Sequence, residues 1–158
     1  MSNVSAALVI QNCPAGKIQD NLTQTIVLAK KAADRNAKIV VFPEMNITGY
    51  VTGKQIFKIS RPITEPLLSP LISCAVNHDI TILAGLAEIT DKKRIYATPL
   101  VFFPDGTVQK YRKTHTAPFE KKYYSCGNSV PVFKSDSFTF GIQLCYDAHF
   151  PELAQDMA

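Results

Sequence analysis

Residues 39–44 read Ile-Val-Val-Phe-Pro-Glu, a short apolar run that ends at a proline and an acid. A continuous apolar run of this length is typical of a strand that is buried on both faces. Upstream, residues 18–36 carry apolar side chains at three- and four-residue steps, which predicts an amphipathic helix. Another strand is predicted over residues 4–11. This part of the chain therefore indicates a strand, a helix and a strand packed in layers.

A second helix and three more strands are predicted downstream. Residues 65–78 predict the helix, with Thr64 as its N-cap and Pro66 in its first turn. Pro70 lies further inside and predicts a late start or a kink. The predicted strands cover residues 80–89, 95–103 and 107–111, and Pro104-Asp105-Gly106 turns the chain between the last two. This alternation predicts an α/β or layered α+β fold.

The last part of the chain has less regular patterning. Residues 114–130 show no clear period and predict a long loop, and long loops in compact domains are usually functional or disordered. A strand is predicted over residues 138–144, with Cys145 at its end, and Pro151 then suits the first position of a helix. We expect residues 1–158 to form a single domain that is incomplete at its C-terminus, because that helix has barely begun where the sequence stops.

The composition excludes several classes of protein. Hydrophobic residues make up 46% and charged residues 19% of the 158 residues, which is a globular and not a disordered balance. The net charge of +4 comes from scattered residues, so no nucleic-acid partner is expected. No apolar run approaches the roughly 18 residues of a membrane span. The four cysteines form no C-x-x-C pair and no signal peptide precedes them, so we expect free thiols in a reducing cytoplasm.

Three polar side chains follow predicted strands, namely Glu44, Lys113 and Cys145. Taken singly, Glu44 is better explained as a solvated acid, Lys113 as an exposed lysine and Cys145 as a core cysteine. Taken together they could meet at one edge of the sheet as a general base, an oxyanion donor and a nucleophile. Partial burial would raise the pKa of the acid, and a nearby ammonium would favour the thiolate.

Other chemistries fit the sequence less well. A Cys–His mechanism could use His115 or His149, but neither has a clear orienting partner. Zinc binding by Cys126, Cys145, His115 and His149 lacks the usual closely spaced pairs. The chain has no phosphate-binding loop and no G-x-G-x-x-G motif. No metal and no organic cofactor is therefore expected.

Three stretches, residues 40–50, 111–115 and 141–152, resemble the segments that surround the catalytic residues of the nitrilase superfamily of carbon–nitrogen hydrolases. The resemblance implies that Glu44 is the base, that Lys113 holds the oxyanion and that Cys145 is the nucleophile. This family also has a second glutamate between the lysine and the cysteine. Glu120 is the best match, and it is expected to orient the substrate or the lysine.

The resemblance also implies the rest of the site and the fold. The Cys-Tyr-Asp form at residues 145–147 resembles amidase-like branches, and Tyr50, Tyr146 and His149 are expected to contact the substrate. The family fold is a four-layer α-β-β-α sandwich, of which this chain would be a part that is truncated after the nucleophile strand. We therefore expect the activity to belong to the complete enzyme, as a homodimer or higher homo-oligomer, and not to these residues alone.

The implied reaction is hydrolysis of a non-peptide carbon–nitrogen bond in a small amide or N-carbamoyl compound. A thioester on the cysteine would be the intermediate, and ammonia or an amine would be released. Two other functions stay open: a non-catalytic fragment or homologue that acts by protein association, and a thiol-dependent N-acyltransferase. The sequence leaves aliphatic amides, ω-amides of dicarboxylic acids and N-carbamoyl compounds as possible substrates.

Overall fold

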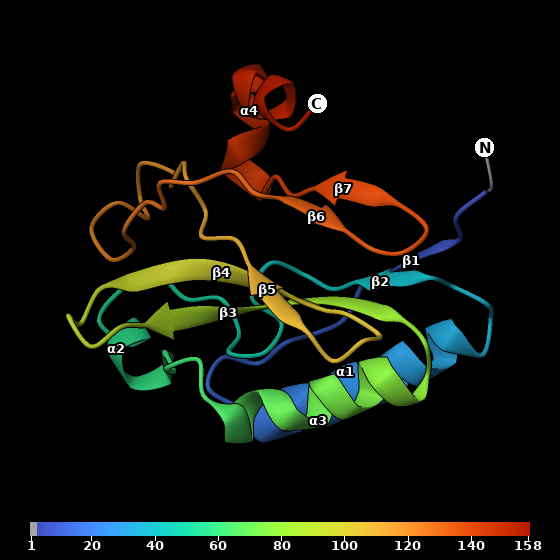
Figure 1. Ribbon diagram of the computed structural model, residues 1–158. Coiled ribbons are helices and arrows are strands. Elements are labelled where there is room, and N and C mark those ends of the chain that lie inside the picture. The colour runs from blue at the N-terminus through green and yellow to red at the C-terminus, as the bar shows by residue number, and fades with distance from the viewer. Residues whose placement is uncertain (1–2) are drawn as a thin grey trace.

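Two β-sheets and two long helices make up the computed structural model, which describes residues 3–158 (Figure 1). The larger sheet has five strands in the order β1-β2-β3-β4-β5, and the smaller sheet pairs β6 with β7. The strands are β1 Ala6–Leu8, β2 Ile39–Val41, β3 Thr81–Ile89, β4 Ile95–Phe102, β5 Val108–Lys110, β6 Val132–Lys134 and β7 Thr139–Gly141. The helices are α1 Ile18–Ala33, α2 Ile56–Ile59, α3 Glu65–Asn77, the 3-10 helix η1 Cys145–His149 and α4 Pro151–Asp156.

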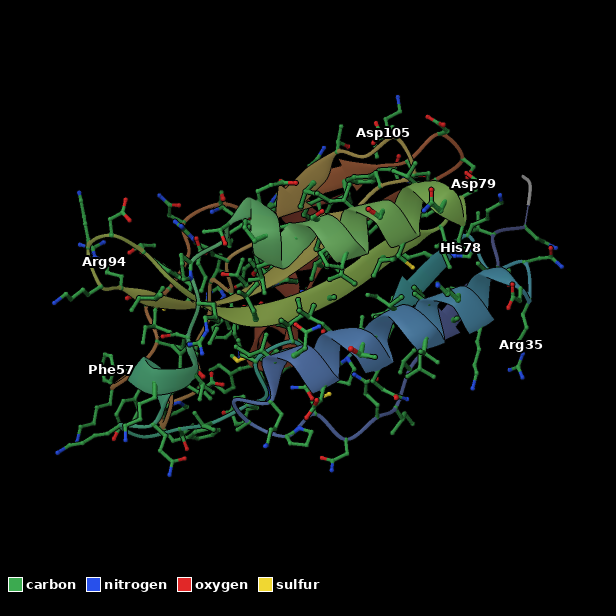
Figure 2. The ribbon with its side chains drawn as sticks, turned by 90° about the horizontal axis from the view of Figure 1, so that it is seen from below. Arg35, Phe57, His78, Asp79, Arg94 and Asp105 are labelled. Atoms are coloured by element: carbon green, nitrogen blue, oxygen red, sulfur yellow. The ribbon has the colours of Figure 1, made fainter. Side chains whose placement is uncertain are left out.

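The larger sheet buries a different apolar layer on each of its faces. Helices α1 and α3 lie side by side across one face, where they pack on strand residues such as Val40, Ile82 and Leu100 (Figure 2). Side chains that point to the other face, including Leu83 and Val101, pack against the smaller sheet. Helix α4 lies beyond β6 and β7 at the top of Figure 1. The layered α/β fold that the sequence predicted is confirmed.

The direction of each strand decides which side chains can meet. Strands β1, β2 and β3 are parallel, because α1 and then α2 and α3 return the chain to the same end of the sheet. Strands β3, β4 and β5 are antiparallel neighbours. β5 therefore runs in the same direction as β2, and both strands end at the same edge of the sheet.

Both long helices were predicted correctly, but details at their ends differ. α3 begins at Glu65, so Pro70 does not delay its start. Thr64 stands at the N-cap position, yet its side chain makes no capping hydrogen bond within residues 3–158. Pro66 explains how the helix can begin without that bond, because a proline in the first turn lacks one of the N–H groups that a cap would satisfy. The four-residue helix α2 was not predicted, since one turn is too short to show a period.

The predictions were less accurate for the first strand and for the smaller sheet. β1 covers only Ala6–Leu8 instead of residues 4–11, and β7 covers only Thr139–Gly141 instead of residues 138–144. β7 ends early because the chain bends into η1, and the amide of Leu144 donates to Asp147 Oδ2 at 3.0 Å instead of to a neighbouring strand. Strand β6 was not predicted at all.

Candidate active site

Lys113 is the centre of a buried ionic cluster. Its side chain has no exposed surface, and Nζ donates to Glu44 Oε1 at 2.9 Å and to Glu120 Oε2 at 3.0 Å. A further contact of 3.3 Å reaches Glu120 Oε1. Nζ thus has three contacts with carboxylate oxygens, and two of these contacts share the carboxylate of Glu120.

The sheet edge positions Lys113 and Glu44. Lys113 lies just beyond β5, where its amide still donates to the carbonyl of Ala97 at 2.9 Å and so keeps the register of the ladder. Glu44 lies just beyond β2, between Phe42, whose amide bonds to Leu83, and Ile47, whose amide bonds to Gly85. These backbone bonds tie the segment around Glu44 to β3. They explain how residues that are 69 positions apart form an ion pair.

Glu120 is held by the loop that follows β5. Its Oε2 accepts from the amide of Ala117 at 2.7 Å, and its Oε1 accepts from the hydroxyl of Tyr50 at 2.9 Å. Desolvation raises the pKa of Tyr50, and the hydrogen bond to Glu120 raises it further. Tyr50 therefore stays a neutral donor. Glu120 is anchored on all sides, as expected for a residue that orients its neighbours.

The two ends of the main ion pair respond differently to burial. Burial raises the pKa of Glu44, and the bond to Lys113 offsets only part of this effect. For Lys113, burial alone would lower the pKa, but the bonds to Glu44 and Glu120 outweigh it and raise the pKa. The lysine thus stays cationic, while the glutamate accepts a proton more readily than an exposed carboxylate.

Cys145 follows strand β7 of the smaller sheet, whereas Glu44 and Lys113 follow strands of the larger sheet. The sequence had suggested that all three residues lie at one edge of a single sheet. It is the exposed first residue of η1, and its backbone has φ 42°, in the left-handed region that non-glycine residues rarely occupy. Such a conformation costs on the order of 1 kcal/mol and persists only where neighbouring bonds enforce it.

Asp147 supplies those neighbouring bonds. Its carboxylate is fully buried and accepts from the amides of Leu144 and His115 and from the hydroxyl of Tyr111, at 2.9–3.0 Å. It therefore ties the turn at Cys145 to the segment that carries Lys113. Sequence reasoning missed Asp147, because the donors that it binds lie on the distant segment around Tyr111 and His115.

One cavity brings the cluster and the thiol together. It has a volume of about 520 Å³, and its walls include Glu44, Tyr50, Glu120 and Cys145. The remaining lining residues are Gln11, Cys13, Pro43, Met45 and Phe119. An acid and a thiol thus line a space large enough for a small molecule. The buried ammonium of Lys113 is bonded to that acid but is not among the lining residues.

The sequence profile of the family described as carbon-nitrogen hydrolase matches residues 5–158 of the chain. The chain belongs to this family. The nitrilase-superfamily resemblance that was stated from the motifs is confirmed, and the fold agrees with it.

Several relatives of this carbon–nitrogen hydrolase chain are amidases. An (R)-stereoselective amidase from Pseudomonas sp. is 30% identical over 139 residues, which cover 87% of this chain and 50% of the relative. The human omega-amidase NIT2 is 33% identical over 147 residues, which cover 86% of this chain and 52% of the relative. The crystal structure of Nit3 from Saccharomyces cerevisiae superposes with a TM-score of 0.86 at 27% identity, over 98% of this chain and 59% of that chain. The chain spans about half the length of the curated relatives it matches.

The other residues that the sequence proposed are not among the lining residues of the cavity in the described part of the chain. Tyr146 and His149 belong to η1, where their rings pack together with centroids 5.0 Å apart, and neither lines the cavity in the described chain. His115 stacks on Phe150 with centroids 3.7 Å apart, and it too lies outside the cavity lining. Substrate contacts by Tyr146 and His149 stay predictions.

Within residues 3–158, no three His, Cys, Asp or Glu side chains gather where they could hold a metal ion. In the same part of the hydrolase chain, no helix combines the length and the apolar character needed to cross a bilayer.

Proposed function

We propose that this protein hydrolyses a non-peptide carbon–nitrogen bond, in a small amide or N-carbamoyl compound, through a thioester on Cys145. One observation carries the proposal. The buried ammonium of Lys113 is bonded to two carboxylates, Glu44 and Glu120, that line the same cavity as Cys145. This arrangement supplies a base and a thiol on the walls of one cavity, together with a fixed positive charge that is bonded to the base.

Acylation begins when Glu44 takes the thiol proton and the sulfur of Cys145 attacks the carbonyl carbon. The oxygen of the tetrahedral intermediate carries a negative charge, which Lys113 and the backbone N–H of Tyr146 stabilise. Loss of one such donor typically raises the barrier by about 3–4 kcal/mol. As the C–N bond breaks, Glu44 gives its proton to the leaving nitrogen, so ammonia or an amine departs and a thioester remains.

Deacylation repeats the same proton transfers with water. Glu44 takes a proton from the water as its oxygen attacks the thioester carbon. The C–S bond then breaks, the sulfur recovers the proton and the acid leaves. Glu120 keeps the ammonium in place through both half-reactions, because its own bonds to Ala117 and Tyr50 hold it fixed.

The acylation half-reaction can be tested on this chain with a small p-nitrophenyl ester as the acyl donor. Peptide mass spectrometry should locate the acyl group on Cys145, and neutral hydroxylamine should remove it, as expected for a thioester. Cys126 is also exposed and serves as an unassisted thiol in the same sample. General-base assistance predicts that Cys145 reacts at least about a hundredfold faster than Cys126. An equal rate at the two thiols, or an adduct that persists in Cys145→Ala, would defeat the proposal.

We also infer self-association and a reducing compartment for the complete protein. All four cysteines are free thiols in the structure, which fits a reducing environment. Leu8 and Ile10 on and beside β1 are 80% and 100% exposed, which is unusual for large apolar side chains and fits coverage by another segment or subunit. Light scattering on the complete protein measures the mass of the assembly and so tests self-association.

A further inference from the structure

Tyr111 links the turn that carries Cys145 to the larger sheet. Its hydroxyl donates to Asp147 Oδ2 at 2.9 Å, and the same oxygen accepts from the amide of Leu144 at 3.0 Å. Leu144 directly precedes Cys145 in the chain. The carboxylate oxygen that holds the turn before Cys145 is thus itself held by Tyr111.

The direction of this hydroxyl bond follows from its other contacts. The amide of Thr114 donates to the hydroxyl oxygen of Tyr111 at 3.1 Å, so this oxygen already accepts one hydrogen bond. A carboxylate has no hydrogen to give, so the hydrogen between Tyr111 and Asp147 is the one that the hydroxyl carries. Desolvation raises the pKa of Tyr111 to about 12, so the hydroxyl keeps that hydrogen near neutral pH.

Tyr111 is in turn anchored to the larger sheet. Its amide donates to the carbonyl of Pro99 in β4 at 3.1 Å, and its side chain is buried. The ring belongs to the apolar cluster between the two sheets, which also contains Leu83 and Phe133. The hydroxyl therefore projects from a well-anchored position that lies two residues before Lys113.

The hydroxyl bond joins the two parts of the proposed catalytic set. Lys113 and its partner Glu44 follow strands of the larger sheet, whereas Cys145 follows a strand of the smaller one. A general base must lie within hydrogen-bond reach of the proton that it takes. A displacement of about 1 Å can slow a reaction by about a hundredfold. The turn that carries the thiol must therefore keep a fixed place relative to the larger sheet.

We propose that Tyr111 is a positioning residue, whose hydroxyl acts through Asp147 to hold the turn before Cys145 in place. The thiol is thereby kept within reach of Glu44. For its effect on the reaction the inference rests on the proposed function, because it takes Glu44 as the base. Tyr111 acts through another side chain, so it is not itself a catalytic residue.

Tyr111→Phe removes the hydroxyl, keeps the ring and so tests the link. The amide of Leu144 should exchange with solvent about tenfold faster in this variant, as measured by NMR, because the acceptor that protects it is held less firmly. Thr98→Val is the matched control, since it removes another buried hydroxyl that donates to a buried carboxylate, Glu88, at 2.8 Å. The control should leave the exchange of Leu144 unchanged. Equal exchange in Tyr111→Phe and the unmodified chain would overturn the inference.

The reactivity of Cys145 gives a second measurement. Its acylation by the p-nitrophenyl ester and its alkylation by iodoacetamide should both slow about tenfold or more in Tyr111→Phe. The decrease in rate at low pH that Glu44 imposes should also disappear. A loss of stability alone, as in Thr98→Val, lowers the amount of folded chain and leaves the shape of the pH profile unchanged. An unaltered profile in Tyr111→Phe, beside a clear decrease in the unmodified chain, would also overturn the inference.

The two measurements separate this inference from the proposed function. If Cys145 of the unmodified chain reacts no faster than the exposed Cys126, the proposed function fails. The exchange of Leu144 then still decides whether Tyr111 holds the turn. If Cys145 is fast and keeps its rate and pH profile in Tyr111→Phe, the proposed function stands and the inference fails.

Discussion

Lys113 is the residue on which the site depends. It is fully buried, and its positive charge is shared between Glu44 and Glu120. Removal of one partner of a buried ion pair leaves the other charge unpaired, which typically costs about 3–5 kcal/mol. Here one substitution would leave two acids unpaired and close to each other.

A double-mutant cycle measures that dependence. Lys113→Met should lower the free energy of unfolding by about 3–5 kcal/mol, measured by urea denaturation. The same substitution should cost less in a Glu120→Gln background, because one of the two stranded charges is already gone. Lys134→Met, at an exposed lysine, is the control and should change little. Costs that simply add would show that the two side chains are not coupled.

The pKa of Glu44 should set the pH dependence of the acylation rate at Cys145. The acid must be ionised to accept the proton of Cys145, and burial raises its pKa above the ordinary value of 4.5. Acylation of Cys145 should therefore slow as the pH falls, with a midpoint higher than that of an exposed glutamate. Glu44→Gln should be slow at all pH values and lack this limb. A midpoint at or below 4.5 in the unmodified chain would contradict the role of Glu44 as a base.

These residues differ in how far the sequence could reveal them. A recognisable strand precedes each of Glu44, Lys113 and Cys145. Their side chains, an acid, an ammonium and a thiol, suggested that the three residues act in one reaction. Asp147 could not be weighed in the same way, because its importance comes from donors on the distant segment around Tyr111 and His115. Burial of a polar group among such partners is a property of the folded chain.

At the scale of elements, β3 must pass very close to the segment that carries Glu44. A Cβ at Gly85 would overlap the carbonyl oxygen of Glu44, so this strand position needs glycine. Gly85→Ala should shift the segment, destabilise the chain by about 1–3 kcal/mol and slow the alkylation of Cys145. Ala84→Gly, one residue earlier, removes a Cβ and should affect stability alone. Unchanged alkylation in Gly85→Ala would show that Glu44 keeps its place.

Glu88 joins three strands of the larger sheet. From β3 it accepts hydrogen bonds from Thr98 of β4 at 2.8 Å, from Lys110 of β5 at 3.0 Å and from Arg112 just beyond β5 at 2.8 Å. Burial alone would raise the pKa of Glu88, but these bonds outweigh it and lower the pKa to about 2. A lowered pKa means that the ionised acid stabilises the fold, and that this contribution is lost as the pH falls from about 4.5 toward 2.

Glu88→Gln tests that contribution. It should lower the free energy of unfolding near neutral pH by about 3 kcal/mol, since each pKa unit corresponds to about 1.4 kcal/mol. The difference from the unmodified chain should shrink as the pH is lowered, as followed by urea denaturation at several pH values. Asn128→Gln, at an exposed uncharged position, is the control and should leave the pH trend of the unmodified chain unchanged. A constant difference across the acid range would contradict the linkage.

At the scale of the whole molecule, the sequence predicted the helix layer and the larger sheet better than the smaller sheet. The long helices and the central strands carry strong periodic patterns, so their existence followed from local residues. Strands β6 and β7 have three residues each. They form because they pair with each other, and because Phe133 of β6 and Ile142, just after β7, pack on the larger sheet. A short strand that depends on distant packing has little local signal.

The loop between β5 and β6 shows that irregular backbone can still be firmly held. The amide of Ser125 donates to Ile95 at 2.7 Å, the amide of Gly127 donates to Lys113 at 2.8 Å, and the hydroxyl of Tyr124 donates to the carbonyl of Val51 at 2.9 Å. Glu120 adds the ionic cluster to these attachments. The loop is therefore attached at several points, to β4, to the segment after β5 and to the segment before α2.

Proteases should detect this anchoring. Trypsin cuts chain that is locally unfolded. Lys121 and Lys122 are exposed, but the peptide bonds after them lie in a segment that is fixed at both ends. Cleavage there should be slow in the native chain and should accelerate in Glu120→Gln, as followed by the time course of fragments on a gel. Rapid cutting of the unmodified chain would mean that the loop opens readily. Slow cleavage of the unmodified chain together with fast cleavage of Glu120→Gln would mean that trypsin digestion after Lys121 and Lys122 reports whether the buried pair of Lys113 and Glu120 is intact.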